Sequence, residues 1–231
     1  MLSRIPDPDA IAASLSKDSY CVLPKLLSAA QCTGLRTLYD REDLFRKRIV
    51  MQRHGYGRGE YQYFTYPLPG LVLELRTGLY PSLALVANQW NACLKREGRF
   101  PEHHDAFRQA CAEAGQTRPT PLLLKYRAGD YNCLHQDLYG AMVFPLQVAV
   151  LLSEPGQDFR GGEFILTEQR PRMQSRASVV PLTQGDAVIF PVRERPVAGA
   201  RGIYRVNLRH GVGTVQSGER FTLGVIFHDA A

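Results

Sequence analysis

The chain has 231 residues, of which 45% are hydrophobic and 22% charged, so wholesale disorder is excluded. A chain of this length forms one large domain or two small ones. Its 28 Lys and Arg residues exceed its 22 Asp and Glu residues, and the net charge of +6 favours an anionic partner.

Membrane, secreted and disulfide-rich classes do not fit the sequence. No apolar run reaches the roughly 18 residues that a membrane span needs, and the N-terminal segment lacks the apolar core of a secretory signal. The five cysteines are scattered and form no CxxC pair, which favours a reducing compartment. We therefore expect a cytoplasmic protein without a membrane partner, with its cysteines buried as small hydrophobic residues. The oligomeric state stays open.

Helical patterns dominate the first half of the chain. Ser28 suits the N-cap of one helix, and Gly115 suits the end of another. Pro81 falls inside the longest amphipathic run and predicts a break into two helices. The expected helical segments are residues 7–17, 28–39, 68–96 and 101–115.

Short apolar runs separated by turn residues dominate the second half of the chain. Many short strands at this spacing are typical of a sandwich or barrel. The runs are residues 122–126, 143–152, 163–166, 178–182, 187–190, 203–208 and 221–227. We predict an α+β fold in a single domain over residues 1–231. Its residues 1–119 form a mainly helical layer with a substrate loop, and residues 120–231 form a jelly-roll catalytic core.

His135 and Asp137 form an HxD pair in a segment that reads as extended. Residues i and i+2 of a strand point to the same face, so the imidazole and the carboxylate are expected to converge. A non-haem Fe(II) site needs two histidines and one carboxylate. His210 is the best candidate for the third ligand, because no other histidine lies between it and Asp137. His103 and His104 begin a predicted helix, where we expect them to be exposed.

Arg220 and Thr222 follow ten and twelve residues after His210, again two apart in a strand-like run. A guanidinium buried in this way is costly unless it meets an anion. A dicarboxylic cosubstrate would provide that anion and could be held bidentately.

The ordered series of these motifs resembles the Fe(II)/2-oxoglutarate-dependent dioxygenases over residues 120–229. The resemblance implies a double-stranded β-helix that uses Fe(II), 2-oxoglutarate and O2. It implies that His135, Asp137 and His210 bind iron, that Arg220 and Tyr126 hold the far carboxylate of 2-oxoglutarate, and that Thr222 lies beside the arginine. The matching motifs are Tyr126-x-x-Gly129, His135-x-Asp137, Gly161-Gly162-Glu163, Gly185-Asp186, His210 and Gly218-x-Arg220-x-Thr222.

Longer stretches of the sequence resemble a more specific family of oxygenases. The stretches YRAGDYNCLHQDLYG, GGEFILTEQRPRMQSR and LRHGV are similar to a bacterial oxygenase family assigned to damaged nucleic acid. This implies hydroxylation or oxidative demethylation of a substrate such as alkylated nucleic acid. The spacing of His210 and Arg220 is also similar to prolyl hydroxylases, so a protein or small-molecule hydroxylase on the same scaffold is the alternative. The second arginine that alkylation-repair enzymes carry on the last strand is missing after Arg220.

A basic, aromatic segment in the first half is the candidate substrate loop. Aromatic side chains interleaved with arginines can stack on and grip an extruded base. The alternative is that these aromatics alternate in a strand, with half of them in the core. The candidate substrate residues are Arg53, His54, Tyr56, Arg58 and Tyr61. A cluster of arginines over residues 193–209 could neutralise phosphates or could pair with acidic residues.

Overall fold

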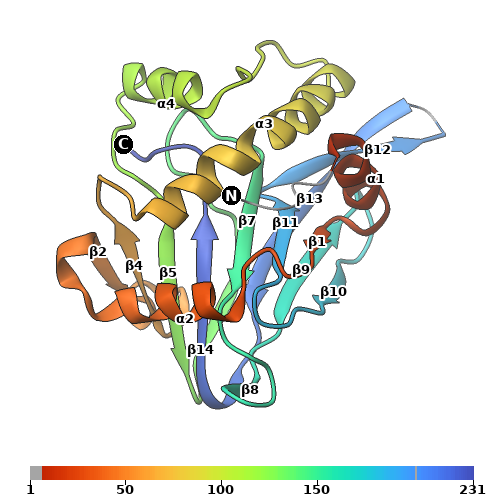
Figure 1. The fold of residues 1–231 in the computed structure, drawn as a ribbon. Helices are drawn as coiled ribbons and strands as arrows, with labels where there is room; N and C mark the ends of the chain where they lie inside the picture. The colour runs from red at the N-terminus through yellow and green to blue at the C-terminus, as the bar shows by residue number, and fades with distance from the viewer. Residues whose placement is uncertain (1–6, 201) are drawn as a thin grey trace.

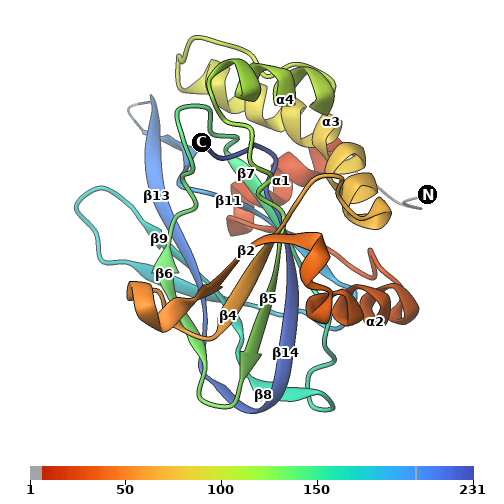
Figure 2. The ribbon, with the colours of Figure 1, turned by 90° about the vertical axis from the view of Figure 1, so that its left-hand side faces the viewer.

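The computed structural model describes residues 7–200 and 202–231, which form two antiparallel sheets and a layer of helices (Figures 1 and 2). The helices are α1 (Pro8–Asp18), α2 (Ala29–Thr37), α3 (Gly70–Cys93) and α4 (His104–Glu113), with short 3-10 turns η1 (Leu38–Asp40), η2 (Glu42–Leu44) and η3 (Met51–His54). This arrangement confirms the predicted α+β class with a jelly-roll core.

The larger sheet has eight strands and carries the helices on its outer face. Its order is β1 (Cys21–Leu23), β11 (Ala187–Pro191), β7 (Leu146–Leu151), β14 (Val215–Val225), β5 (Leu122–Arg127), β4 (Glu60–Phe64) and β2 (Phe45–Val50), with β8 (Phe159–Gly161) paired to β14. The largest hydrophobic cluster joins apolar residues of all four helices to β5, β7, β11 and β14. Burial of that cluster therefore fixes the sheet against the helical layer.

The smaller sheet has six strands and faces the inner side of the larger one across a cavity. Its order is β10 (Arg176–Val180), β9 (Phe164–Gln169), β13 (Gly202–Val212), β6 (Tyr131–His135) and β3 (Gly57–Arg58), with β12 (Glu194–Gly199) paired to β13. Strands β1 to β4 come from the first half of the chain, so residues 1–119 extend both sheets as well as supplying helices.

The predicted helical segments form, and side-chain caps explain where α1 and α2 begin. The Asp7 carboxylate accepts a hydrogen bond from the Asp9 amide at the start of α1. Ser28 and Gln31 form a reciprocal capping box at the start of α2. Such caps satisfy backbone amides that have no partner within the helix.

The predicted break at Pro81 is wrong, because α3 runs unbroken from Gly70 to Cys93. A proline inside a helix costs about 3 kcal/mol. Leu75 and Leu79 before it and Leu83 and Val86 after it are fully buried. Each buried side chain of this kind contributes roughly 1.5–3 kcal/mol, so packing on both sides of the proline outweighs its cost.

Helix α3 also differs from the expectation that no segment could span a membrane. Judged by length and composition alone, α3 is long and apolar enough to cross a membrane. It is the single helix of this kind among the described residues. A count of consecutive apolar residues misses it because Glu74, Arg76, Thr77 and Ser82 interrupt the run. Half of its most apolar window is buried inside the protein.

Two expectations about exposure are also wrong. His104 is buried, because its ring packs on Tyr80 and its Nε2 lies 2.8 Å from the carbonyl oxygen of Phe227. Burial lowers the pKa of His104 to about 4. Cys93 and Cys133 are exposed, whereas the other three cysteines are buried; all five are free thiols.

A buried ion pair ties the C-terminal segment to α3. The Arg76 guanidinium donates to Asp229 at 2.6 Å and to the carbonyl oxygens of Ile226 and Phe227, and both side chains are almost completely buried. Tyr66 donates to the second Asp229 oxygen. The pair therefore holds residues 226–229, which follow β14, against α3.

Asp229→Ala is expected to lower the free energy of unfolding by about 3–5 kcal/mol, because it leaves the Arg76 charge buried without its partner. Chemical denaturation measures this value. The control is Asp43→Ala, which breaks a fully exposed pair with Arg41 and should change the free energy of unfolding much less. Equal effects of the two substitutions would contradict the role given to the buried pair.

Candidate active site

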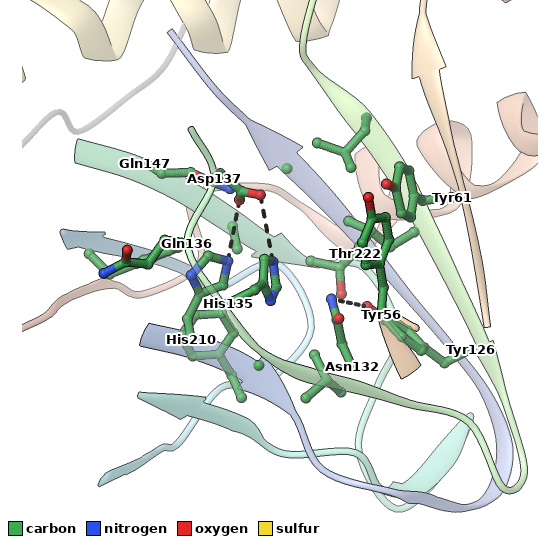
Figure 3. A pocket seen from close by; sticks show the side chains of 18 of the residues that line it. Tyr56, Tyr61, Tyr126, Asn132, His135, Gln136, Asp137, Gln147, His210 and Thr222 are labelled. Atoms are coloured by element: carbon green, nitrogen blue, oxygen red, sulfur yellow. Dashed lines mark hydrogen bonds and ion pairs between the residues drawn. The ribbon is translucent and has the colours of Figure 1, made fainter. Parts of the chain in front are cut away.

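A cavity of about 410 Å³ lies between the inner faces of the two sheets (Figure 3). Strands β5, β7 and β14 supply one wall, and β6, β9 and β13 supply the other. Most of its surface is apolar, and its polar side chains are few. The polar and charged residues of the lining are Tyr56, Tyr61, Tyr126, Asn132, His135, Gln136, Asp137, Tyr139, Gln147, His210, Arg220 and Thr222.

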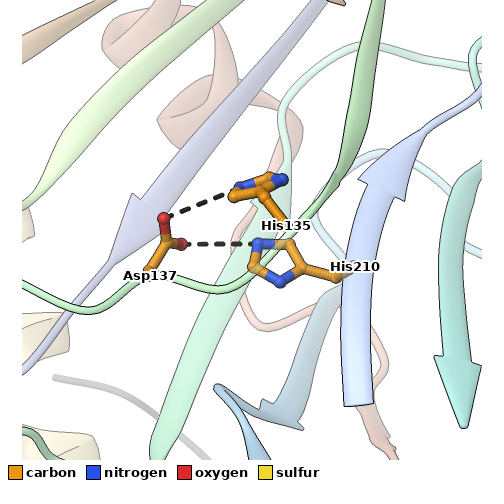
Figure 4. Close-up of side chains that lie close together, drawn as sticks. All are labelled: His135, Asp137 and His210. Carbon is orange, nitrogen blue, oxygen red and sulfur yellow. Dashed lines mark ion pairs between the residues drawn. The ribbon is translucent and has the colours of Figure 1, made fainter. Parts of the chain in front are cut away.

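His135, Asp137 and His210 meet at one side of this cavity (Figure 4). The Nε2 atom of His135 lies 3.6 Å from Asp137 Oδ1, and Nε2 of His210 lies 3.4 Å from Oδ2. The antiparallel register of β13 and β6 places His210 opposite His135, with the ring centroids 4.2 Å apart. Pairing of two strands far apart in the sequence thus builds the cluster.

Asp137 is not in a strand, contrary to the sequence-based expectation. Strand β6 ends at His135, and Asp137 lies in the loop that follows. The carboxylate still turns toward His135, because it contacts both imidazoles and accepts a hydrogen bond from the Tyr139 hydroxyl at 2.6 Å. Convergence therefore depends on these contacts and not on strand alternation.

The electrostatics of the cluster suit a bound cation. Burial alone would raise the pKa of Asp137, but the hydrogen bond with His210 and the nearby imidazoles lower it below its usual range. Burial, followed by the proximity of His135, lowers the pKa of His210. An ionised Asp137 carboxylate beside a neutral His210 imidazole is the protonation state that metal binding requires.

The ligand atoms of the three residues lie within 4.8 Å of one another, and the described residues contain no second group of this kind. The His135 Nδ1 lies 2.7 Å from the carbonyl oxygen of Cys133, which leaves Nε2 facing the cluster. A hydrogen bond from the ring nitrogen that does not bind the metal orients a metal-binding imidazole. Two histidines and one carboxylate with an open side toward a cavity fit a mononuclear Fe(II) site.

Arg220 places a buried positive charge at the other side of the cavity. Its side chain is 2% exposed, and Nη1 donates to Thr222 Oγ1 at 2.6 Å. Its buried Nε has no hydrogen-bond partner within the described part of the chain. Burial lowers its pKa to about 10, while Tyr126 and Glu163 partly offset that effect. No carboxylate of the described residues forms an ion pair with the guanidinium, and a dicarboxylate in the cavity can supply one.

The backbone around Arg220 leaves no room for a larger neighbour. Gly162 adopts a left-handed φ of +63°, and a Cβ added to it would lie 2.7 Å from Val215 Cγ2 and 3.0 Å from Arg220 Cδ. Only glycine combines this conformation with this closeness. The Gly161-Gly162-Glu163 motif thus shapes the wall behind the guanidinium.

Tyr126 is fully buried beside Arg220, and its hydroxyl accepts a hydrogen bond from Asn132 Nδ2 at 3.3 Å (Figure 3). The Arg220 guanidinium lies 5.6 Å from the Tyr126 ring centroid. Burial raises the pKa of Tyr126 to about 12, so the hydroxyl stays protonated. It can donate to a carboxylate held by Arg220.

The five candidate substrate residues separate into two groups. Tyr56 and Tyr61 line the cavity, and Tyr56 is 50% exposed at its edge. Arg53, His54 and Arg58 do not line it. His54 nevertheless stacks on Tyr56, with ring centroids 5.3 Å apart and 21° between the planes. The structure therefore brings two aromatic residues of this segment to the cavity.

Sequence reasoning missed Tyr139, Asn132, Gln136 and Gln147 as cavity residues. Gln136 donates to the carbonyl oxygen of Leu208 at 2.7 Å and so ties the HxD loop to β13. Tyr139 could have been found from its position two residues after Asp137. Gln147 could not, because it is one polar residue within a buried apolar strand.

The arginine cluster over residues 193–209 is partly structural. Arg195 is buried and donates to Glu168 at 2.6 Å and to the Ser19 hydroxyl. Arg205 lies within ion-pair distance of Glu194. Arg201 lies outside the described residues. Pairing with acidic residues thus uses some of the charge that could have met phosphates.

Comparison with known proteins identifies the family to which this chain is similar. Residues 59–230 match the model of a family described as "Oxygenase, catalysing oxidative methylation of damaged DNA". The chain is also 50% identical over 168 residues to uncharacterized proteins from two strains of Mycobacterium tuberculosis. The match spans 73% of this chain and 72% of each relative.

Solved structures share the fold at low sequence identity. A prolyl-4-hydroxylase from Pseudomonas putida superposes with a TM-score of 0.56 at 15% identity, covering 97% of this chain and 100% of the other. A 2OG-Fe(II) oxygenase family oxidoreductase from Burkholderia pseudomallei gives 0.53 at 15% identity, covering 99% and 94%. These likenesses establish the double-stranded β-helix.

Proposed function

The chain belongs to the oxygenase family described for damaged DNA and is an Fe(II)- and 2-oxoglutarate-dependent oxygenase, and on that premise we propose that it oxidatively demethylates alkylated nucleic acid. The single observation that carries the proposal is the cavity, whose lining contains the His135, Asp137 and His210 cluster, the Arg220 charge and the edge tyrosines Tyr56 and Tyr61.

His135, Asp137 and His210 would hold the iron through two imidazoles and the carboxylate. Iron bound there would, with 2-oxoglutarate and O2, supply the oxidising chemistry for hydroxylation of a substrate C–H bond. Arg220 would bind the far carboxylate, with Thr222 fixing one end of the guanidinium and Tyr126 donating a further hydrogen bond. The apolar walls exclude water from the reacting groups.

The substrate proposal follows from the family and the cavity edge. A half-exposed aromatic side chain such as Tyr56 offers a face on which a base can stack. A base lifted out of its strand could then reach the cluster inside the cavity. Hydroxylation of an N-methyl carbon gives an unstable product that releases formaldehyde, so the net result would be removal of the methyl group.

We expect formaldehyde release from single-stranded oligonucleotides that carry N-methylated bases, and none from unmethylated ones. The logarithm of the binding constant should fall linearly with the logarithm of the salt concentration, with a slope of roughly −0.7 per phosphate contacted. Tyr56→Ala should weaken binding about 5- to 150-fold, since stacking on one aromatic is worth about 1–3 kcal/mol. The control Tyr204→Ala makes the same change at a half-buried tyrosine outside the cavity.

A protein or small-molecule hydroxylase is the competing outcome of the same experiment. It would release succinate from 2-oxoglutarate without any stimulation by methylated or unmethylated oligonucleotides. Stimulation by a peptide or a small molecule in their place would overturn the nucleic-acid proposal and leave the oxygenase chemistry intact.

A further inference from the structure

One contact at the cluster has no part in binding the cosubstrate. The Tyr139 hydroxyl donates to Asp137 Oδ1 at 2.6 Å, while Oδ2 faces His210 Nε2 at 3.4 Å. A tyrosine hydroxyl has one hydrogen, and a carboxylate can only accept it. Tyr139 thus engages one of the two oxygens that Asp137 could offer to a metal.

Two further tyrosines continue from Tyr139 into β4. Tyr63 meets Tyr139 edge to face with ring centroids 6.2 Å apart, and Tyr61 meets Tyr63 in the same way at 5.3 Å. The three rings therefore pack in series, from β4 to the residue that contacts Asp137.

Tyr63 is held firmly in this series. Its side chain is buried, and the Arg46 guanidinium lies 4.6 Å from its ring centroid. Arg46 is itself fixed by a hydrogen bond from Nε to the carbonyl oxygen of Pro119. Because β4 pairs with β5, the eight-stranded sheet sets the place of Tyr63 and, through it, that of Tyr139.

We propose that Tyr139 is a positioning residue that restricts Asp137 to one-oxygen ligation of the metal, supported by Tyr63 and Tyr61. A hydrogen bond on Oδ1 lowers the ability of that oxygen to bind a cation and fixes the carboxylate plane, so Oδ2 is the ligand. One-oxygen ligation keeps positions open for 2-oxoglutarate and O2. The inference rests on the iron ligands given under the proposed function and is independent of the substrate.

The test is a titration of the metal-free protein with Co(II), read by affinity and by visible absorption. Tyr139→Phe is expected to weaken Co(II) binding roughly 10- to 100-fold, the usual effect of losing a contact to a metal ligand, and to change the absorption spectrum. Tyr63→Leu should act in the same direction but less, because it removes the ring that packs on Tyr139 while Tyr139 still contacts Asp137. Tyr80→Phe is the matched control, since the Tyr80 hydroxyl is buried and has no partner within the described residues.

Unchanged affinity and spectrum in folded Tyr139→Phe would overturn the inference. If Tyr139→Phe fails to fold, an unchanged spectrum in Tyr63→Leu overturns it instead. An effect of Tyr80→Phe equal to that of Tyr139→Phe would also overturn it, because the loss would then be unspecific. Failure of the ligand assignment looks different: Asp137→Ala would bind Co(II) as tightly as the unaltered protein.

Discussion

Asp137→Ala is expected to abolish 2-oxoglutarate turnover and metal binding. The carboxylate is the one anionic member of the cluster, and the substitution leaves only two imidazoles, 4.2 Å apart between ring centroids. Losing even an outer contact to a metal ligand costs roughly 10- to 100-fold in affinity, so losing the ligand itself should cost at least about 100-fold. Succinate formation and Co(II) titration measure the two effects.

A suitable control for Asp137→Ala is Asp43→Ala, which removes an exposed carboxylate far from the cavity lining. It should leave both measurements unchanged. Turnover that survives Asp137→Ala would mean that the cluster is not the metal site, and the oxygenase chemistry would have to be placed elsewhere in the chain.

Arg220→Ala is expected to raise the 2-oxoglutarate concentration needed for half-maximal turnover by about 100-fold or more. Two charge-assisted hydrogen bonds to a carboxylate contribute about 1.5–3 kcal/mol each, and 1.4 kcal/mol is a factor of ten. The substitution should leave Co(II) affinity close to that of the unaltered protein, because Arg220 contacts Thr222 and not the cluster.

Arg220→Lys separates the charge from the shape of the group. Lysine keeps the positive charge but loses the planar fork, so we expect partial recovery of 2-oxoglutarate binding. If Arg220→Ala binds 2-oxoglutarate as the unaltered protein does, another residue must hold the far carboxylate.

The sequence predicted the cluster for a reason that the structure only partly supports. The i, i+2 spacing suggested that His135 and Asp137 share a strand face, yet β6 ends at His135. The pair still converges, because Gln136 ties the loop to β13 and Tyr139 holds the carboxylate. A spacing rule can thus find the right residues while the contacts that place them stay hidden in the loop.

Contacts between distant strands set the limit of sequence reasoning here. Tyr63 reaches Tyr139 only because β4 pairs with β5 in the larger sheet, whereas Tyr139 follows the HxD loop of the smaller sheet. No local pattern encodes that pairing. The same limit applies to α3, because tertiary packing overrides the local helix-breaking tendency of Pro81.

The most direct test is a crystal structure grown without oxygen in the presence of Fe(II) and 2-oxoglutarate. We predict one iron ion bonded to His135, Asp137 and His210, with the far carboxylate of 2-oxoglutarate on Arg220. An ion bound by other side chains, or a 2-oxoglutarate that does not contact Arg220, would contradict the account.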